Sequence, residues 1–274
     1  MIKKIFGLCF IACLLCALFV MPAGAAEYDF EITDGVLEMY DGPGGSVTIP
    51  DEVTAIGDSA FADCETLTSV TIPSGVESLG EGAFAGCTAL GSVTLPEGLK
   101  DLGTETFAYC TALTEITIPG SVSEIGESVF AGCTALRSVT IPDGVKTIGE
   151  SAFAGCTALT EVTLPESVTA IGDSAFYDCT ELTGVVIPAA VKSIGSDAFA
   201  DCPFLIIYGG TNATVMAYAR ENEIPFLASS VSGVEIRTET VIPFWVFVVI
   251  DIMAFIILVF LFVTIRRRAK TARR

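Results

Sequence analysis

Histidine is absent from this 274-residue chain, and tryptophan occurs only once. Without histidine, the chain cannot form a nucleophile–histidine catalytic pair or a zinc site with imidazole ligands. Basic residues are also scarce: 14 Lys and Arg stand against 33 Asp and Glu, a formal net charge of −19. Nucleic-acid binding is not expected, because phosphate contacts require Lys and Arg on the contact face. We therefore expect neither a catalytic residue nor a cofactor.

Residues 1–26 have the pattern of a secretory signal peptide. Two lysines precede an apolar run that ends at Met21, and the small residues 23–26 form an A-x-A-like cleavage site. We expect cleavage after Ala25 or Ala26. A retained membrane anchor is the alternative interpretation.

A second apolar segment, residues 241–265, predicts a transmembrane helix. Its 25 residues are enough to span a bilayer core with some tilt. Trp245 lies near its start, and the basic tail 266–274 that follows belongs on the cytoplasmic side. A buried core helix is the alternative, but such a helix would show a polar face. The two ends predict a single-pass membrane protein with residues 27–240 outside the cell.

One charge, Asp251, lies near the middle of this predicted span. A charge at the bilayer centre costs about 2.5–3.5 kcal/mol on insertion scales, and the surrounding apolar residues outweigh that cost. An intramembrane acid indicates a partner within the membrane. A tolerated or protonated acid is the alternative.

Between the two ends, the sequence repeats every 23 residues. Seven copies occupy residues 47–207 without insertion or deletion, and residues 139–161, VTIPDGVKTIGESAFAGCTALTE, are a typical copy. A fixed period in the twenties indicates a solenoid, because one coil cannot bury its own apolar face and stacked coils bury a continuous core. We expect residues 27–46 to be a degenerate coil that caps the N-terminal end, 208–228 to be the other cap, and 229–240 to be a linker.

The C-terminal cap contains a short predicted helix. Thr211 or Asn212 can cap its start, and Val215, Tyr218 and Ala219 face one way. Caps are expected at both ends, because open solenoid edges invite aggregation.

Each copy predicts a strand, a second short extended piece and a tight helical turn. In the strand, Val70 and Ile72 point inward and Thr71 points outward, and Pro73 ends it. Gly80 and its equivalents follow the second piece, where we expect a positive φ. Parallel in-register strands would stack equivalent residues of successive copies into columns, with neighbouring residues of one column about 4.8 Å apart. The phenylalanine column is Phe61, Phe84, Phe107, Phe130, Phe153, Phe176 and Phe199.

The frame C-x-x-L-x-x-V-x-I-P-x-x-V-x-x-I-G-x-x-A-F, seen from Cys133 to Phe153, resembles the 23-residue leucine-rich repeats of BspA-like bacterial surface proteins. Proline stands where ordinary leucine-rich repeats have asparagine, so we expect a gentle curve and little helix. The resemblance implies binding or adhesion at a cell surface.

The seven cysteines outside residues 1–26 form one column with a spacing of 23 residues. Neighbours in such a column point in parallel, which fits poorly with a disulfide dihedral near 90°. Their spacing suits no zinc site. We expect buried free thiols, with disulfides as the alternative. The column is Cys64, Cys87, Cys110, Cys133, Cys156, Cys179 and Cys202.

An acidic column lies beside the turn. The 27–240 segment holds all but one of the acidic residues and only six basic ones, so a solvated acidic face is the simple interpretation. Calcium binding is the alternative, although each coil offers about one carboxylate. The column is Asp58, Glu81, Glu127, Glu150 and Asp173, with Glu105 and Asp197 one position later in their copies.

The outward side of the strands is the candidate ligand face. Threonine suits an outward strand position in any case, and binding is the functional alternative. The face lacks the Trp, Tyr and Arg anchors of tight protein contacts, which favours weak or multivalent binding. Its candidate residues are Thr71, Thr94, Thr117, Thr140, Thr163, Glu115 and Glu161.

These observations predict a non-enzymatic, membrane-anchored cell-surface protein that binds an extracellular protein or glycan. One alternative is a structural envelope component without a specific ligand. Another is a receptor-like protein that acts through Asp251 and a membrane partner, because the short tail cannot hold a signalling domain.

Overall fold

The computed structural model describes residues 30–210 and 212–228, which lie within one compact unit, Met1–Ser230. No helix in these described ranges is long and apolar enough to cross a membrane. The expected signal peptide, linker, span at 241–265, Asp251 and basic tail all lie outside the described residues, so those predictions stay predictions.

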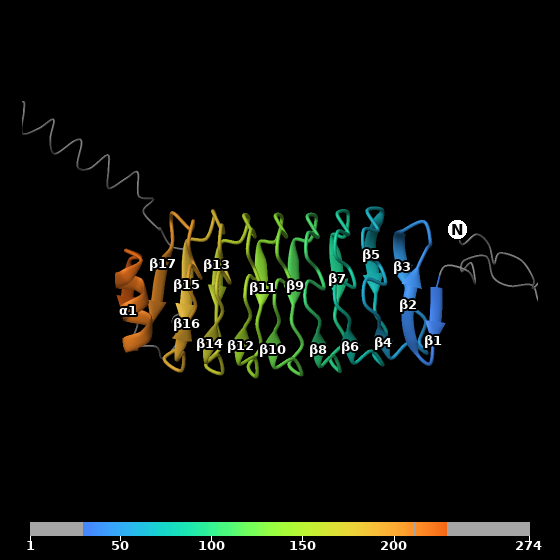
Figure 1. Ribbon diagram of the computed structural model, residues 1–274, viewed down its shortest axis with the longest axis horizontal. Coiled ribbons are helices and arrows are strands. Elements are labelled where there is room, and N and C mark those ends of the chain that lie inside the picture. The colour runs from blue at the N-terminus through green and yellow to red at the C-terminus, as the bar shows by residue number, and fades with distance from the viewer. Residues whose placement is uncertain (1–29, 211, 229–274) are drawn as a thin grey trace, which may run out of the picture. The chain divides into compact units, whose positions relative to one another are not determined.

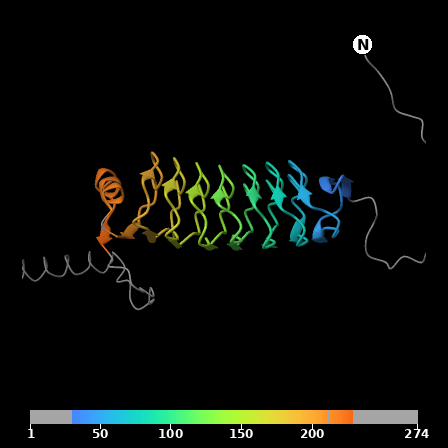
Figure 2. The same cartoon turned by 90° about the horizontal axis from the view of Figure 1, so that it is seen from below.

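The described chain is a solenoid whose coils stack along one axis (Figures 1 and 2). Two rows of strands run along it. The first row contains β3 (Gly45–Thr48), β5 (Leu67–Thr71), β7 (Ser92–Thr94), β9 (Glu115–Thr117), β11 (Ser138–Thr140), β13 (Glu161–Thr163), β15 (Gly184–Ile187), β17 (Ile206–Gly209) and β18 (Phe226–Ala228). The second row contains β1 (Phe30–Thr33), β2 (Val36–Tyr40), β4 (Ala55–Ile56), β6 (Ser78–Leu79), β8 (Asp101–Leu102), β10 (Glu124–Ile125), β12 (Thr147–Ile148), β14 (Ala170–Ile171) and β16 (Ser193–Ile194).

Apart from the antiparallel pair of β1 and β2, pairing within the rows is parallel, as the 23-residue period requires. Val70 pairs with Val93 in the first row, and Ile148 pairs with Ile171 in the second. The apolar residue of each copy therefore stacks on the same residue of the next copy. This arrangement confirms the predicted parallel solenoid with a continuous apolar core.

The core contains a continuous stack of aromatic rings. The seven phenylalanines from Phe61 to Phe199 are buried, with centroids of neighbouring rings 4.9 to 5.7 Å apart and interplanar angles of at most 14°. Tyr40 stacks on Phe61 at one end, and Tyr218 meets Phe199 edge-on at the other. Offset stacking of this kind adds to the free energy gained from burial.

The third side of each coil, residues 58–64 in the first copy and their equivalents, is here called the turn wall. The expected helical turn is wrong, because this segment places left-handed residues, such as Ser59 with φ 55° and Asp63 with φ 58°, where a helical turn needs right-handed ones. In the first copy, the N–H groups of Ser59, Phe61 and Asp63 donate to carbonyls of the next coil at 2.7–2.8 Å. The alternate N–H groups of Ala62 and Cys64 bond within the coil. The turn wall is thus a third ladder between coils.

This alternation requires left-handed backbone at two positions per coil, four residues apart. Their φ values lie between 52° and 72°, which no continuous right-handed helix allows. The positions are Ser59, Asp63, Gly82, Gly86, Glu105, Tyr109, Ser128, Gly132, Ser151, Gly155, Ser174, Asp178, Asp197 and Asp201.

The recurrent glycine at Gly80 and its equivalents serves another purpose than the one predicted. None of these glycines has a positive φ. A Cβ added at Gly149 would instead lie 2.6 Å from the carbonyl carbon of Gly126 in the preceding coil, and one at Gly172 would meet Gly149 at the same distance. Glycine recurs there because the backbones of neighbouring coils nearly touch.

The last strand of the repeat departs from the 23-residue count. Ile206 pairs with Gly184 and Tyr208 with Val186, although a strict count would place Ile207 beside Gly184. The expectation of no deletion through Ile207 is therefore wrong by one residue. The shift buries Ile207 completely and leaves Ile206 and Tyr208 half-buried.

The ends of the solenoid are covered differently. At the N-terminal end, β1 and β2 form an antiparallel hairpin, and β2 pairs with β4. At the other end lies α1 (Ala213–Glu221), whose first turn is capped by the Asn212 side chain accepting from the Thr214 N–H at 2.8 Å. Val215 and Ala219 are buried, which confirms the predicted cap and inward face of this helix.

Candidate functional site

The outward side of the first strand row, here called the strand face, carries the residues predicted to bind a ligand. The parallel register places Thr117 beside Thr140 and Glu115 beside Ser138. The structure therefore brings the predicted set together in two adjacent lines across the strands. All seven are exposed: Thr71, Thr94, Thr117, Thr140, Thr163, Glu115 and Glu161.

The two carboxylates of the strand face stand among small neighbours. Glu115 lies beside Ser138, and Glu161 lies beside Gly184. The one ion pair within the described ranges joins Lys100 and Glu77, so neither carboxylate is neutralised by a basic side chain. The result is a flat hydroxyl surface with two free negative charges.

Tyr208 is a strand-face residue that the sequence did not reveal. A strict 23-residue count places it in the inward column of Val185, whereas the one-residue shift pairs it with the outward Val186. Its ring covers Gly184, where an added Cβ would lie 3.3 Å from the ring. The C-terminal end of the face therefore has an aromatic anchor. The only sign of it in the sequence is the apolar Ile207 next to Tyr208, which can take the inward position and leave Tyr208 outward.

The cysteine column occupies the last position of the turn wall, Cys64 in the first copy, three residues after the phenylalanine of the ring stack. The Cys87 thiol donates to the Phe61 carbonyl of the preceding coil at 3.1 Å, and the same bond recurs in every later coil. All seven cysteines of the described ranges are free thiols. Burial raises the pKa of Cys87 and of Cys133 to about 12. These thiols therefore act as packed donors between coils and are poor nucleophiles.

Alkylation should distinguish the end cysteines from the inner ones. A thiol with a pKa of about 12 is ionised in roughly one molecule in ten thousand at pH 8, so the buried cysteines should resist iodoacetamide in the native protein. Half-buried Cys64 and Cys202 should react first. After non-reducing denaturation, mass spectrometry should find all seven modified, whereas stoichiometric disulfides between neighbouring coils would contradict this assignment.

The acidic column forms hydrogen bonds between coils at two of its positions. The Asp58 carboxylate accepts the Glu81 N–H at 2.8 Å, and the Asp173 carboxylate accepts the Ser196 N–H at 2.6 Å. Within the described ranges, no three Cys, Asp or Glu side chains are grouped so that they could hold a metal ion. The other members of the column are exposed, and the column makes this side of the molecule strongly acidic.

A family model described as the BspA type leucine-rich repeat region matches residues 43–156 and 100–217. The chain belongs to this family. The match covers the coils described above, from the last residues of the N-terminal cap to helix α1. This is a family of repeat surface proteins, compatible with protein binding or adhesion and generally non-enzymatic. A search of curated proteins found no match.

Solved structures of bacterial leucine-rich repeat proteins share the fold. A leucine-rich cell surface protein from Faecalibacterium prausnitzii is 36% identical, with a TM-score of 0.62, over 69% of this chain and 55% of its own length. A leucine-rich repeat protein from Eubacterium ventriosum is 30% identical, with a TM-score of 0.58, over 61% of this chain and 46% of its own. This BspA-type chain thus spans about half the length of these two relatives.

Proposed function

We propose that this BspA-type repeat protein is a membrane-anchored, non-enzymatic surface protein whose strand face binds an extracellular protein or glycan. The observation that carries the proposal is the strand face itself, an exposed regular array of hydroxyls with two unpaired carboxylates and Tyr208 at one end. Hydroxyls and carboxylates accept and donate hydrogen bonds to sugars and peptides, and an aromatic ring supplies packing area.

The ordering of the face favours recognition of an extended ligand. Equivalent side chains recur at the spacing of parallel strands, about 4.8 Å, so a ligand lying along the solenoid axis meets the same groups repeatedly. Each contact is weak, and several together give useful avidity. Adhesion proteins work in this regime, and the relative from F. prausnitzii is described as a cell surface protein.

Changing the strand face should weaken ligand binding. We expect the fragment 27–230 to bind at least one component of an extracellular-matrix and glycan array. Tyr208→Ser combined with Glu115→Gln and Glu161→Gln should weaken that binding at least about tenfold, since aromatic anchors carry much of the energy of an interface. Surface plasmon resonance would measure the loss.

Glu127→Gln combined with Glu150→Gln removes as much charge from the exposed acidic column and serves as the matched control. Equal losses in both variants would show that general charge, and not the strand face, governs binding. No binding anywhere on the array would favour the structural envelope component.

The proposed topology has a separate test. Protease added to intact cells should digest residues 27–240 and spare an epitope placed on the tail 266–274, because the basic cluster following residues 241–265 favours a cytoplasmic tail. Repeats that become accessible only after cell lysis would contradict surface exposure while leaving the binding proposal open to test.

A further inference from the structure

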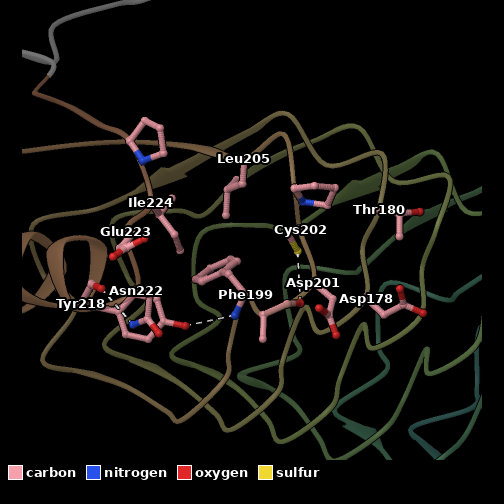
Figure 3. Close-up of a pocket in the computed structure, with 13 residues that line it drawn as sticks. Asp178, Thr180, Phe199, Asp201, Cys202, Leu205, Tyr218, Asn222, Glu223 and Ile224 are labelled. Atoms are coloured by element: carbon pink, nitrogen blue, oxygen red, sulfur yellow. Dashed lines mark hydrogen bonds between the residues drawn. The ribbon is translucent and has the colours of Figure 1, made fainter. Parts of the chain in front are cut away.

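A groove of about 750 Å³ lies at the C-terminal end of the solenoid, on the turn-wall side (Figure 3). Its lining comes from the turns of the last two coils and from the segment that includes the end of α1 and the residues after it. Half-buried Ile224 and exposed Pro203 and Pro225 supply the accessible apolar part of the lining, above the buried Phe199 and Leu205. Tyr218 supplies an aromatic wall. The groove contains no residue of the strand face.

The groove is held in shape by contacts between the last coil and the helix. The Tyr218 hydroxyl accepts the Phe199 N–H at 3.1 Å, and the two rings meet edge-on with centroids 6.0 Å apart. The Ile224 N–H donates to the Ala219 carbonyl at 2.8 Å, which fixes the segment after α1. A preformed groove of this size matches the usual range of ligand sites.

The rim of the groove is negatively charged. Asp178, Asp201 and Glu223 are among its lining residues, and no basic side chain is. No ion pair within the described ranges involves these three carboxylates. The hydrogen bond to Asp201, together with the Asp201 and Asp178 charges, raises the pKa of neighbouring Tyr177, consistent with a local excess of negative charge.

We propose that this groove binds a lysine- or arginine-bearing segment of a partner protein. Such side chains combine an aliphatic stem, which can pack on Ile224 and Pro203, with a cationic head that can reach the rim carboxylates. A cation is also attracted to the face of an aromatic ring such as that of Tyr218. An anionic or purely apolar segment would leave the three carboxylates unpaired.

The excess of acidic residues in the segment 27–240 would speed the approach of such a partner. Residues 27–240 carry 32 acids and six bases, so a basic segment is drawn toward the surface before it docks. Long-range attraction alone would not select this end of the molecule. The apolar lining beside the rim supplies the selectivity, because only a cationic side chain with an aliphatic stem can pack on it while its charge meets the carboxylates.

Fluorescence anisotropy with the labelled hexapeptide Leu-Lys-Leu-Arg-Ala-Lys would test the proposal on the fragment 27–230, which retains every contact described for the compact unit. The fragment should bind this peptide and should not bind a version with norleucine for lysine and citrulline for arginine. Asp201→Asn combined with Glu223→Gln should weaken binding at least about fivefold, as expected for two exposed ion pairs. Asparagine tolerates the left-handed backbone at position 201.

The matched control is again Glu127→Gln combined with Glu150→Gln, whose positions are outside the groove lining. An equal loss in both double variants, or equal binding of the charged and uncharged peptides, would overturn the proposal. In detergent solution, where no bilayer separates the two, the chain's own basic tail 266–274 is the competing occupant. Weaker peptide binding by the full chain than by the fragment, restored when residues 266–274 are deleted, would assign the groove to that tail and overturn binding of a partner.

Discussion

Replacing Phe130 by alanine is expected to destabilise the solenoid by about 3–5 kcal/mol, the usual cost of truncating a buried phenylalanine. Phe130 lies in the fourth of seven coils and is completely buried. Its ring stacks on Phe107 at 5.7 Å and on Phe153 at 5.3 Å, so the substitution removes packing at two interfaces. Because solenoid stability is roughly a sum over coils and nearest-neighbour interfaces, the loss falls on the middle of the array.

The array should consequently unfold in two steps. Three intact coils remain on each side of the weakened fourth coil, and neither group of three is stabilised by packing through that coil. Denaturant unfolding of the fragment 27–230, followed by far-UV circular dichroism, should lose the single transition of the wild type. Circular dichroism is the suitable probe, since the one tryptophan, Trp245, lies outside this fragment.

Thr117→Ala is the control in the neighbouring part of the coil. Thr117 is exposed on the strand face, and surface substitutions usually stay within about 0.5 kcal/mol of the wild type. Similar losses of stability in the two variants would mean that the inside and outside of the coil have been exchanged.

The sequence predicts the strand rows well because burial there has a simple period. Inward residues such as Val70 and Ile72 alternate with outward Thr71, and the 23-residue spacing sets each on its equivalent in the next coil. The ring stack and the buried cysteine column follow from the same spacing. The strand face is therefore predictable except for Tyr208, where one residue is missing from the count.

The turn wall could not be predicted in the same way. Its residues, such as E-S-A-F-A-G-C, have the composition of a helical turn, and serine, glutamate and tyrosine occupy positions where left-handed backbone is unusual. What selects this conformation is a hydrogen bond to the next coil, such as Phe61 N–H to the Ala83 carbonyl at 2.8 Å. A hydrogen bond between the backbones of two copies cannot be recognised from the residue pattern of a single copy. The same holds for the thiol–carbonyl bonds and the C-terminal groove.

Replacing Gly149 by alanine is expected to destabilise the fragment 27–230 by about 3 kcal/mol, near the upper end for overpacked sites. The added Cβ would lie 2.6 Å from the carbonyl carbon of Gly126 and 2.7 Å from its oxygen. These are backbone atoms, so no side-chain rotation can relieve the contact. Relief requires the two coils to separate, which would lengthen the 2.8 Å hydrogen bond from Gly149 N–H to the Ile125 carbonyl.

Gly120→Ala separates this effect from a general cost of losing glycine. Gly120 is exposed, lacks a positive φ, and an added Cβ there meets nothing within 4 Å. Alanine should instead raise stability by about 0.4–1 kcal/mol, because it restricts the unfolded chain. Chemical denaturation should therefore give changes of opposite sign in the free energy of unfolding for the two variants. If Gly149→Ala were as stable as the wild type, close approach of the coils could not explain why glycine recurs at this position in every copy.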